Sequence, residues 1–379
     1  MSKYPQIWPS ALAHLKVEQP DQPVLYFAPT VLQDTARAFI EGFSGAVTYA
    51  VKANDARAVI ENLVAAGIGG FDVASLVEIA KVRAVSDAVD LHYNNPVRSR
   101  GEIAAAVAAG VVSYSVDDAL ELAKLVDLVP QGVEIAVRLR LPVEGAVYDF
   151  GTKFGADPED AEALLRRVAE AGFVPAMTFH PGTQCADPAA WLAYIEVCAD
   201  IARRAGVRIK RLNVGGGFAS NRGIAPDLAA IFAAIDSAVG AAFGDAAPEL
   251  VCEPGRALAS EAFVLATQVR GVRAGGEVFL NDGVYGSFGE AINSVGVVDR
   301  VSTMTHAGAA HRGVLRDRLL YGPTCDSLDR LPGEFALPED LAEGDFVLFE
   351  GMGAYSTATT TRFNGFGEVR VITVQSGAV

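Results

Sequence analysis

The chain has 379 residues, a length that suggests about two domains. Hydrophobic residues make up 51% of it and charged residues 20%, which is the balance of a packed globular protein and excludes a disordered one. The formal net charge is -15 and the isoelectric point is about 4.8, so we exclude nucleic acid and anionic membranes as main partners.

The sequence carries no pattern of export or metal binding. Residues 1–23 lack the continuous apolar segment of a signal peptide, and no uncharged run approaches the roughly 20 residues of a membrane span. Four cysteines in a chain of 379 residues do not indicate a disulfide framework. No Cys-x-x-Cys motif and no clustered His/Cys spacing indicates a zinc site. We therefore expect a cytoplasmic protein without a metal. The four cysteines are Cys185, Cys198, Cys252 and Cys325.

Short apolar runs alternate with longer Ala-rich and Leu-rich segments from about residue 30 to residue 260. The longer segments, such as 55–67 and 158–172, have apolar residues at helical spacing. Eight such β/α units predict a (β/α)8 TIM-type barrel, with a doubly wound α/β sheet as the alternative. The strand candidates are 47–53, 70–74, 90–95, 111–116, 134–140, 176–182, 211–216 and 250–255.

The pattern changes after about residue 262. Strand-like runs such as 345–351 and 368–375 are separated by Gly, Asp and Pro turns, and long helical patterns are missing. The segment 24–29 near the N-terminus is also strand-like. We therefore predict a barrel at 28–262 and a C-terminal antiparallel β-rich domain formed by 1–27 and 263–379.

Polar residues fall at the C-terminal ends of the predicted barrel strands, the face on which barrels place their reaction sites. A partly desolvated lysine such as Lys52 has a lowered pKa and can form a Schiff base, although most lysines at strand ends are salt-bridged. A carboxylate such as Glu253 can keep a pyridine nitrogen protonated. His180 can stack on a ring, although a lone histidine is more often a core residue. The polar residues and glycines at strand ends are Lys52, Asp72, Arg138, His180, Gly215, Gly216, Gly217 and Glu253.

Further motifs fit phosphate binding and proton transfer. The glycines of NVGGGF (213–218) allow backbone N–H groups to approach a phosphate, with a turn that binds nothing as the alternative. Arg256 can pair with a phosphate. In GPTCDS, Cys325 is a candidate proton donor and Asp326 a candidate ligand of a substrate ammonium group.

The order of these motifs carries more information than any one of them. AVKAND, GFDVAS, HPGTQ, GGGF, CEPGR, NDGVYGSF, GPTCDS, GAYS and FNGF occur in sequence from about residue 24 to residue 373. Together they resemble the pyridoxal phosphate (PLP) decarboxylases of the alanine-racemase fold, the ornithine/lysine/diaminopimelate group, and among these ornithine decarboxylases most closely. The resemblance implies PLP as cofactor, decarboxylation of a basic amino acid to a diamine, and a homodimer with active sites at the subunit interface.

The resemblance also implies a role for each site residue. Lys52 would carry the cofactor, with Asp72 supporting it and Arg138 near the ring. His180 would stack on the ring and Glu253 would pair with its nitrogen. Cys325 would protonate the carbon that has lost carbon dioxide, and it would reach in from the partner subunit with Asp326 and Phe363. The phosphate would be held by Gly215, Gly216, Gly217, Thr183, Arg256 and Tyr355.

The sequence departs from the family pattern at three places. Thr183 stands in HPGTQ where the family usually reads HVGSQ, and it keeps a hydroxyl. Counted from Tyr285, the expected acid that binds the distal ammonium is replaced by Ser294, while the nearby acid Glu290 is out of register. The pocket is thus open to lysine or arginine as well as ornithine. The predicted substrate-binding residues are Asp326, Tyr285, Phe363, Glu290 and Ser294.

The third departure is a basic segment at 305–322. It is either a surface loop or a segment whose arginine binds the carboxylate of a conjugated polyamine substrate.

The sequence also leaves alternative functions open for this fold. Diaminopimelate decarboxylases typically read Cys-Glu rather than Cys325-Asp326, and a racemase needs a second base on the opposite face of the ring. A catalytically inactive regulator of polyamine metabolism and a one-domain PLP carrier are the alternatives from other classes.

Overall fold

The computed structural model describes residues 7–141, 153–293 and 300–376. The chain divides into two compact units. The barrel unit comprises Thr35–Ala219 and Pro226–Gly255. The sheet unit comprises Met1–Asp34, Ser220–Ala225 and Arg256–Val379.

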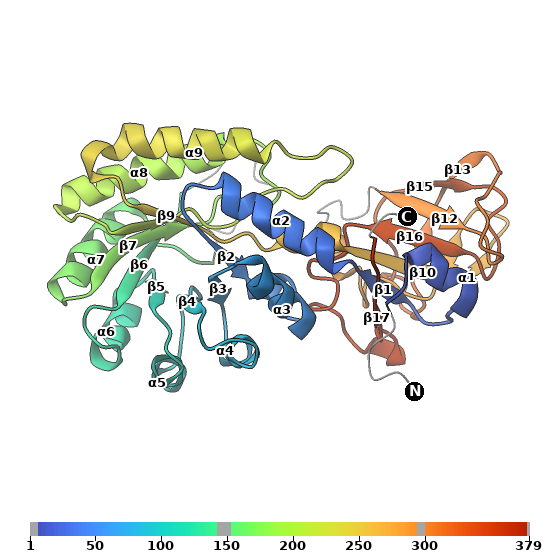
Figure 1. Cartoon of the computed structure of the whole chain (residues 1–379), viewed down its shortest axis with the longest axis horizontal. Coiled ribbons are helices and arrows are strands. Elements are labelled where there is room, and N and C mark those ends of the chain that lie inside the picture. The colour runs from blue at the N-terminus through green and yellow to red at the C-terminus, as the bar shows by residue number, and fades with distance from the viewer. Residues whose placement is uncertain (1–6, 142–152, 294–299, 377–379) are drawn as a thin grey trace. The chain divides into compact units, whose positions relative to one another are not determined.

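The core of the barrel unit is a closed barrel of parallel strands (Figure 1). Neighbouring strands pair in sequence order and β9 pairs back with β2, which confirms the TIM-type barrel predicted from the alternating pattern. In chain order the strands are β2 (Ala46–Ala50), β3 (Gly70–Val73), β4 (Asp90–Tyr93), β5 (Ser113–Val116), β6 (Glu134–Leu139), β7 (Val174–Phe179), β8 (Arg211–Asn213) and β9 (Glu249–Cys252).

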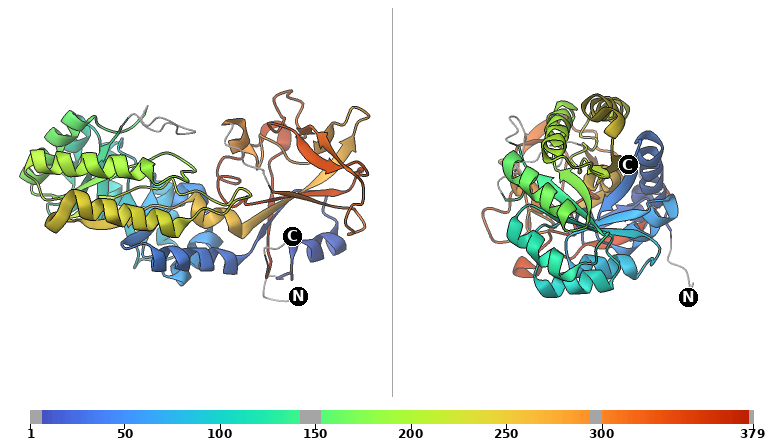
Figure 2. Two further views of the ribbon diagram at one scale, coloured as in Figure 1. Left: turned by 90° about the horizontal axis from the view of Figure 1, so that it is seen from above. Right: turned by 90° about the vertical axis from the view of Figure 1, so that its left-hand side faces the viewer.

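Helices surround the barrel strands, as the end-on view in Figure 2 shows. Their ends follow local rules. In α5, Ser99 and Glu102 form a reciprocal capping box at the N-terminus, and α8 ends at Gly206 in the left-handed conformation. The helices are α2 (Pro29–Gly42), α3 (Arg57–Ala66), α4 (Leu76–Arg83), α5 (Arg100–Ala108), α6 (Ala119–Leu128), α7 (Pro158–Glu170), α8 (Ala189–Ala205) and α9 (Leu228–Phe243).

Helix α9 is unusually apolar. By length and composition the segment Leu228–Ala246 is the one helix in the described residues that passes the test for a membrane span. It lies beside α8 in both views and buries one face on the barrel (Figures 1 and 2). In that face the Phe232 ring contacts the rings of Phe39 and Phe43 at centroid distances of 5.3 and 5.6 Å. This packing accounts for the apolar residues on that face of α9.

The sheet unit is built around a sheet with the order β12-β16-β10-β1-β17. The N-terminal strand β1 joins this sheet as predicted, and it takes an inner position. β1 pairs antiparallel with β10 and parallel with β17, so the sheet is mixed rather than purely antiparallel. β12 and β15 were not expected from the sequence. The strands of this unit are β1 (Val24–Phe27), β10 (Phe263–Val272), β11 (Val278–Leu280), β12 (Val301–Met304), β13 (Leu315–Arg318), β14 (Leu320–Tyr321), β15 (Phe335–Pro338), β16 (Phe346–Glu350) and β17 (Arg370–Thr373).

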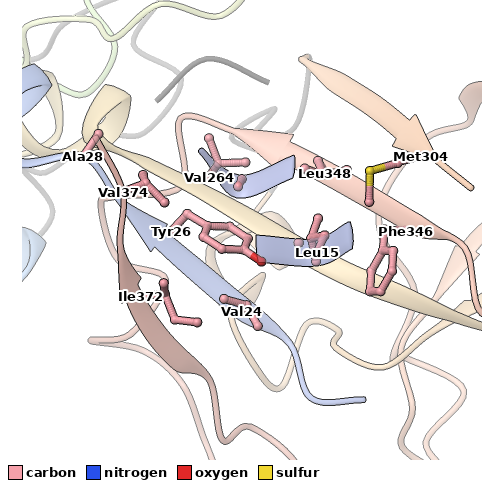
Figure 3. Packing of buried hydrophobic residues seen from close by; sticks show 12 residues of the cluster. Leu15, Val24, Tyr26, Ala28, Val264, Met304, Phe346, Leu348, Ile372 and Val374 are labelled. Carbon is pink, nitrogen blue, oxygen red and sulfur yellow. The ribbon is translucent and has the colours of Figure 1, made fainter. Parts of the chain in front are cut away.

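A hydrophobic cluster packs on one face of this sheet (Figure 3). Leu15, from helix α1 (Ala11–Glu18), and Tyr26, from β1, are both buried in it. The Tyr26 hydroxyl lies 2.7 Å from Nδ1 of His14, so the buried polar end of the tyrosine has a partner. Sequence-distant segments are thereby joined into one core.

Candidate active site

Lys52 follows the first barrel strand. β2 ends at Ala50, and Lys52 lies on a short 3-10 turn, Val51–Ala53, whose other two residues are buried. The Lys52 side chain itself is exposed. Burial of its neighbours therefore fixes the backbone, while the amine projects from the C-terminal end of the barrel as predicted.

Two buried carboxylates lie on the same end of the barrel. Asp72 is the penultimate residue of β3 and Glu253 follows β9, and their exposed fractions are 7% and 9%. Burial raises the pKa of both, and the charge of Asp72 helps to raise the pKa of Glu253 to about 8. The charges of Lys52 and Arg138 oppose this rise. A cationic ring nitrogen placed against Glu253 would favour its ionised form further.

Two asparagines that were not predicted hold Glu253. Asn94 follows β4 and Asn213 ends β8, and the side-chain amide of each donates a hydrogen bond to the same Glu253 oxygen, Oε1. The sequence feature that could have indicated these two residues is their position at the ends of predicted strands, in the segments HYNN and RLNV. An amide at a strand end is too common to single out without the fold.

His180 directly follows β7, and its surroundings favour the neutral imidazole. Burial, together with the positive charges of Lys52 and Arg138, lowers its pKa well below the usual range. Its Nδ1 accepts a hydrogen bond from the backbone N–H of Gly182 at 3.3 Å. Arg138, in β6, is half-buried, and its guanidinium lies 5.4 Å from the centre of the Phe154 ring.

The three glycines after β8 pack so closely on their neighbours that a side chain at any of them would collide. A Cβ on Gly216 would lie 2.8 Å from the Glu253 carbonyl oxygen and 3.4 Å from Nε2 of His180. Gly215 and Gly217 have φ angles of +69° and +86°, in the left-handed region that favours glycine. This loop thus lets a ligand approach backbone N–H groups between His180 and Glu253, which fits the predicted cofactor.

Thr183 lies in the loop after β7, next to the glycine loop. The two loops are joined by a hydrogen bond of 2.8 Å from the Cys185 N–H to the Gly217 carbonyl. The Thr183 side chain is half-buried. Its predicted role as a phosphate ligand remains a prediction.

In the sheet unit, Arg256 contacts Tyr355 and Glu290. The guanidinium carbon lies 4.9 Å from the centre of the Tyr355 ring, and its two terminal nitrogens both donate to the Glu290 carboxylate. Its Nε is buried and has no hydrogen-bond partner among the described residues. A buried N–H group of an arginine without a partner can donate a hydrogen bond to an anionic oxygen. Glu290 was predicted as a substrate ligand and Arg256 as a phosphate ligand, but in the structure these two side chains pair with each other.

A second cluster in the sheet unit brings together the other predicted residues. The Tyr285 hydroxyl donates to Asp326 at 2.5 Å, and the rings of Tyr285 and Phe363 lie 4.8 Å apart. Cys325 is exposed, and its thiol donates to the side-chain oxygen of Asn364 at 3.2 Å. Asn364 was not predicted, although it lies within the FNGF motif.

Ser294 lies outside the described residues. In the basic segment, Arg316 pairs with Glu339 at 2.9 Å, and the largely buried Arg318 donates to the carbonyl oxygens of Pro338 and Glu339. These two arginines are therefore used within the β13–β15 pair.

The fold and these side chains define a class. A parallel barrel with a strand-end lysine, a glycine loop and a buried glutamate belongs to enzymes that bind PLP. The comparisons with known proteins narrow the class. Residues 31–260 match the family model "Pyridoxal-dependent decarboxylase, pyridoxal binding domain". The chain belongs to this family, and PLP is its cofactor.

Relatives cover most of the chain. A lysine/ornithine decarboxylase from Selenomonas ruminantium is 34% identical over 84% of this chain and 81% of its own. Ornithine decarboxylase from Mus musculus is 31% identical over 86% of this chain and 75% of its own. The arginine decarboxylase of Paramecium bursaria Chlorella virus, solved with agmatine, is 28% identical over 95% of this chain and 98% of that one, with a TM-score of 0.85.

Proposed function

We propose that the protein decarboxylates an L-amino acid with a cationic side chain, such as ornithine, lysine or arginine, to a diamine or another polyamine precursor. The pairing of Asp326 with Tyr285 beside Cys325 carries the proposal, because it offers a fixed carboxylate for a distal ammonium next to a proton donor. The printed names of the relatives, which include ornithine, lysine and arginine decarboxylases, support the same substrate class.

Each residue proposed to hold the cofactor has a defined task. Bound PLP supplies an electron sink for the carbon that loses carbon dioxide. Lys52 holds the cofactor through its amine, and Glu253 holds the proton on the ring nitrogen. His180, being neutral, covers the ring without adding charge. Asp72 and Arg138 support the site around Lys52 and the ring. The phosphate is held by Gly215, Gly216, Gly217, Thr183, Arg256 and Tyr355.

The residues of the second cluster act on the substrate. Cys325 gives a proton to the carbon after decarboxylation, and Asp326 binds the distal ammonium beside Tyr285 and Phe363. We propose that they act in the site of a partner subunit, in a cytoplasmic homodimer. The exposed fraction of Phe363, 42%, is consistent with a side chain that a second subunit would cover.

Two of the three arginines in the basic segment 305–322 argue against an acidic or conjugated substrate. Arg316 and Arg318 are engaged within the β13–β15 pair. A substrate carboxylate would have to compete with Glu339 for Arg316. This favours the basic amino acids over carboxylated polyamines.

The test is a carbon dioxide release assay with ornithine, lysine, arginine, diaminopimelate and a carboxylated polyamine. We expect release from at least one of the first three, and loss of the visible cofactor absorbance in Lys52→Ala. Asp326→Asn should raise KM for the cationic substrate more than it lowers kcat, and Cys325→Ala should do the reverse. Release only from diaminopimelate or a carboxylated polyamine would replace the proposed substrate class. A wild-type protein that binds PLP and releases carbon dioxide from none of them would support the inactive regulator.

A further inference from the structure

Asn94 lies between the two buried carboxylates of the barrel unit. Its side-chain amide donates to Oε1 of Glu253. Its side-chain amide and its backbone N–H also stabilise the ionised form of Asp72 and oppose the effect of burial there. One residue thus acts on both acids at the C-terminal end of the barrel.

The turn that carries Asn94 is anchored independently of these acids. The Asn94 carbonyl accepts a hydrogen bond from the Ser115 hydroxyl at 2.8 Å. The buried Arg98 donates to the Tyr93 carbonyl at 2.8 Å and also to the Ser115 carbonyl. Its guanidinium lies over both the Tyr93 and the Tyr114 ring, 5.2 and 5.5 Å from their centres. The amide of Asn94 is therefore presented from a fixed backbone.

The donors leave one Glu253 oxygen available. Both Asn94 and Asn213 use Oε1, and within the described residues no hydrogen bond reaches Oε2. A carboxylate gripped twice on one oxygen has a fixed orientation, and its second oxygen remains for a ligand donor.

We infer that Asn94 is a positioning residue for the cofactor: it orients Glu253 toward the ring nitrogen and keeps the shared proton on that nitrogen. The direction of the effect of Asn94 on the basicity of Glu253 follows from hydrogen-bond chemistry. A carboxylate that accepts N–H donors is a weaker base than one without them. When Asn94 is removed, Glu253 becomes more basic and the proton moves from the ring nitrogen toward the carboxylate. The charged groups that face this pair are Asp72, Lys52 and Arg138.

The inference rests on the cofactor and not on the proposed substrate, so its test has a readout besides activity. Holoprotein is prepared with PLP carrying 15N in its ring, and the 15N chemical shift of the ring nitrogen is measured. We expect the wild type to show a protonated nitrogen and Asn94→Ala to shift toward unprotonated pyridine. The dissociation constant of PLP should rise about tenfold, as for a lost hydrogen bond to a charged group. The kcat should fall more than KM rises.

Asn95→Ala is the matched control, because Asn95 lies on the same turn and its amide contacts the Ala74 carbonyl at 3.5 Å. It should leave the 15N shift unchanged. If Asn94→Ala impairs folding, Asn94→Asp keeps the shape, removes the amide donors and should shift the nitrogen in the same direction. An unchanged 15N shift in the folded Asn94 variants, or an equal shift in Asn95→Ala, would overturn the inference. Failure of every basic amino acid as substrate would overturn only the proposed function.

Discussion

The side-chain oxygen of Asn364 accepts two hydrogen bonds from Cys325, one from the backbone N–H at 3.1 Å and one from the thiol at 3.2 Å. Asn364 has a φ angle of 53°, in the left-handed region that asparagine and glycine tolerate best. The conformation of the FNGF motif and the position of the thiol are therefore linked through one side chain.

We predict that Asn364→Gly slows substrate turnover several-fold without unfolding the protein. Glycine keeps the left-handed backbone and removes only the acceptor, so the thiol loses its fixed orientation. The measurement is kcat together with the fraction of turnovers that consume the cofactor, which should increase. Asn364→Ala serves as a comparison, because it adds backbone strain to the same loss. If Asn364→Gly matches the wild type in both quantities, the hydrogen bond has no role in proton delivery.

We predict that Tyr285→Phe weakens substrate binding more than it slows the reaction. The Tyr285 hydroxyl donates to Asp326 and, together with the Leu328 N–H, lowers the pKa of that carboxyl. Its loss frees the Asp326 side chain to rotate, while the ring contact with Phe363 is retained. Steady-state kinetics should show a KM raised several-fold and a kcat within about twofold. A fall in kcat alone would mean that Tyr285 acts on the reacting atoms instead.

We predict that Gly216→Ala reduces the affinity for PLP by at least tenfold. The new Cβ would lie 2.8 Å from the Glu253 carbonyl oxygen, which is closer than such contacts occur, so the loop must move. The measurement is a titration of apoprotein with PLP, followed by absorbance. Gly240→Ala in α9 is the control, since nothing lies within 4 Å of a Cβ there, and it should bind PLP normally. Equal affinities of the two variants would show that the loop tolerates a side chain.

We predict that His92 makes the barrel unit sensitive to acid. Burial, with a smaller effect of Arg211, lowers its pKa to about 4, against a usual value of 6.5. Between these values the unfolded chain binds the proton and the folded chain does not. Its contribution to stability is therefore complete above about pH 6.5 and is lost as the pH falls toward 4, by up to about 3 kcal/mol.

The check is the drop in melting temperature on going from about pH 7.5 to about pH 5, the range over which the proton is taken up on unfolding. The drop should be smaller in His92→Gln than in the wild type. The control is the same substitution at the exposed His306. His306→Gln should show the same drop in melting temperature as the wild type. The same drop in all three proteins would remove His92 as the source of acid sensitivity.

Much of the barrel was predictable because its signals are local. Apolar runs bounded by turns placed all eight barrel strands, since a strand buried on both faces reads as a continuous apolar segment. A set of polar residues was predicted for the site because they interrupt such runs at their C-terminal ends: Lys52, Asp72, Arg138, His180 and Glu253. Helix α9 was not among the predicted helices, because its apolar residues cover more than one face and weaken the helical periodicity.

The site residues that were not predicted from the sequence make their contacts with segments that are distant in the sequence. Asn94 and Asn213 become significant only when closure of the barrel brings β4, β8 and β9 to one end. Asn364 depends on the approach of the FNGF motif to Cys325. The engagement of Glu290 with Arg256 likewise required the fold. Sequence position indicated which residues carry charge, but not which of them share a hydrogen bond.

The place of β1 in its sheet has a consequence for the order of synthesis. Val24 pairs with Ala266 on one side and with Arg370 on the other, so its neighbours follow after the whole barrel. At typical rates of translation, the newly made β1 waits on the order of tens of seconds for its partners. During that interval an apolar strand has both edges unpaired, and the nascent chain depends on chaperones or on early burial against α1 to avoid aggregation.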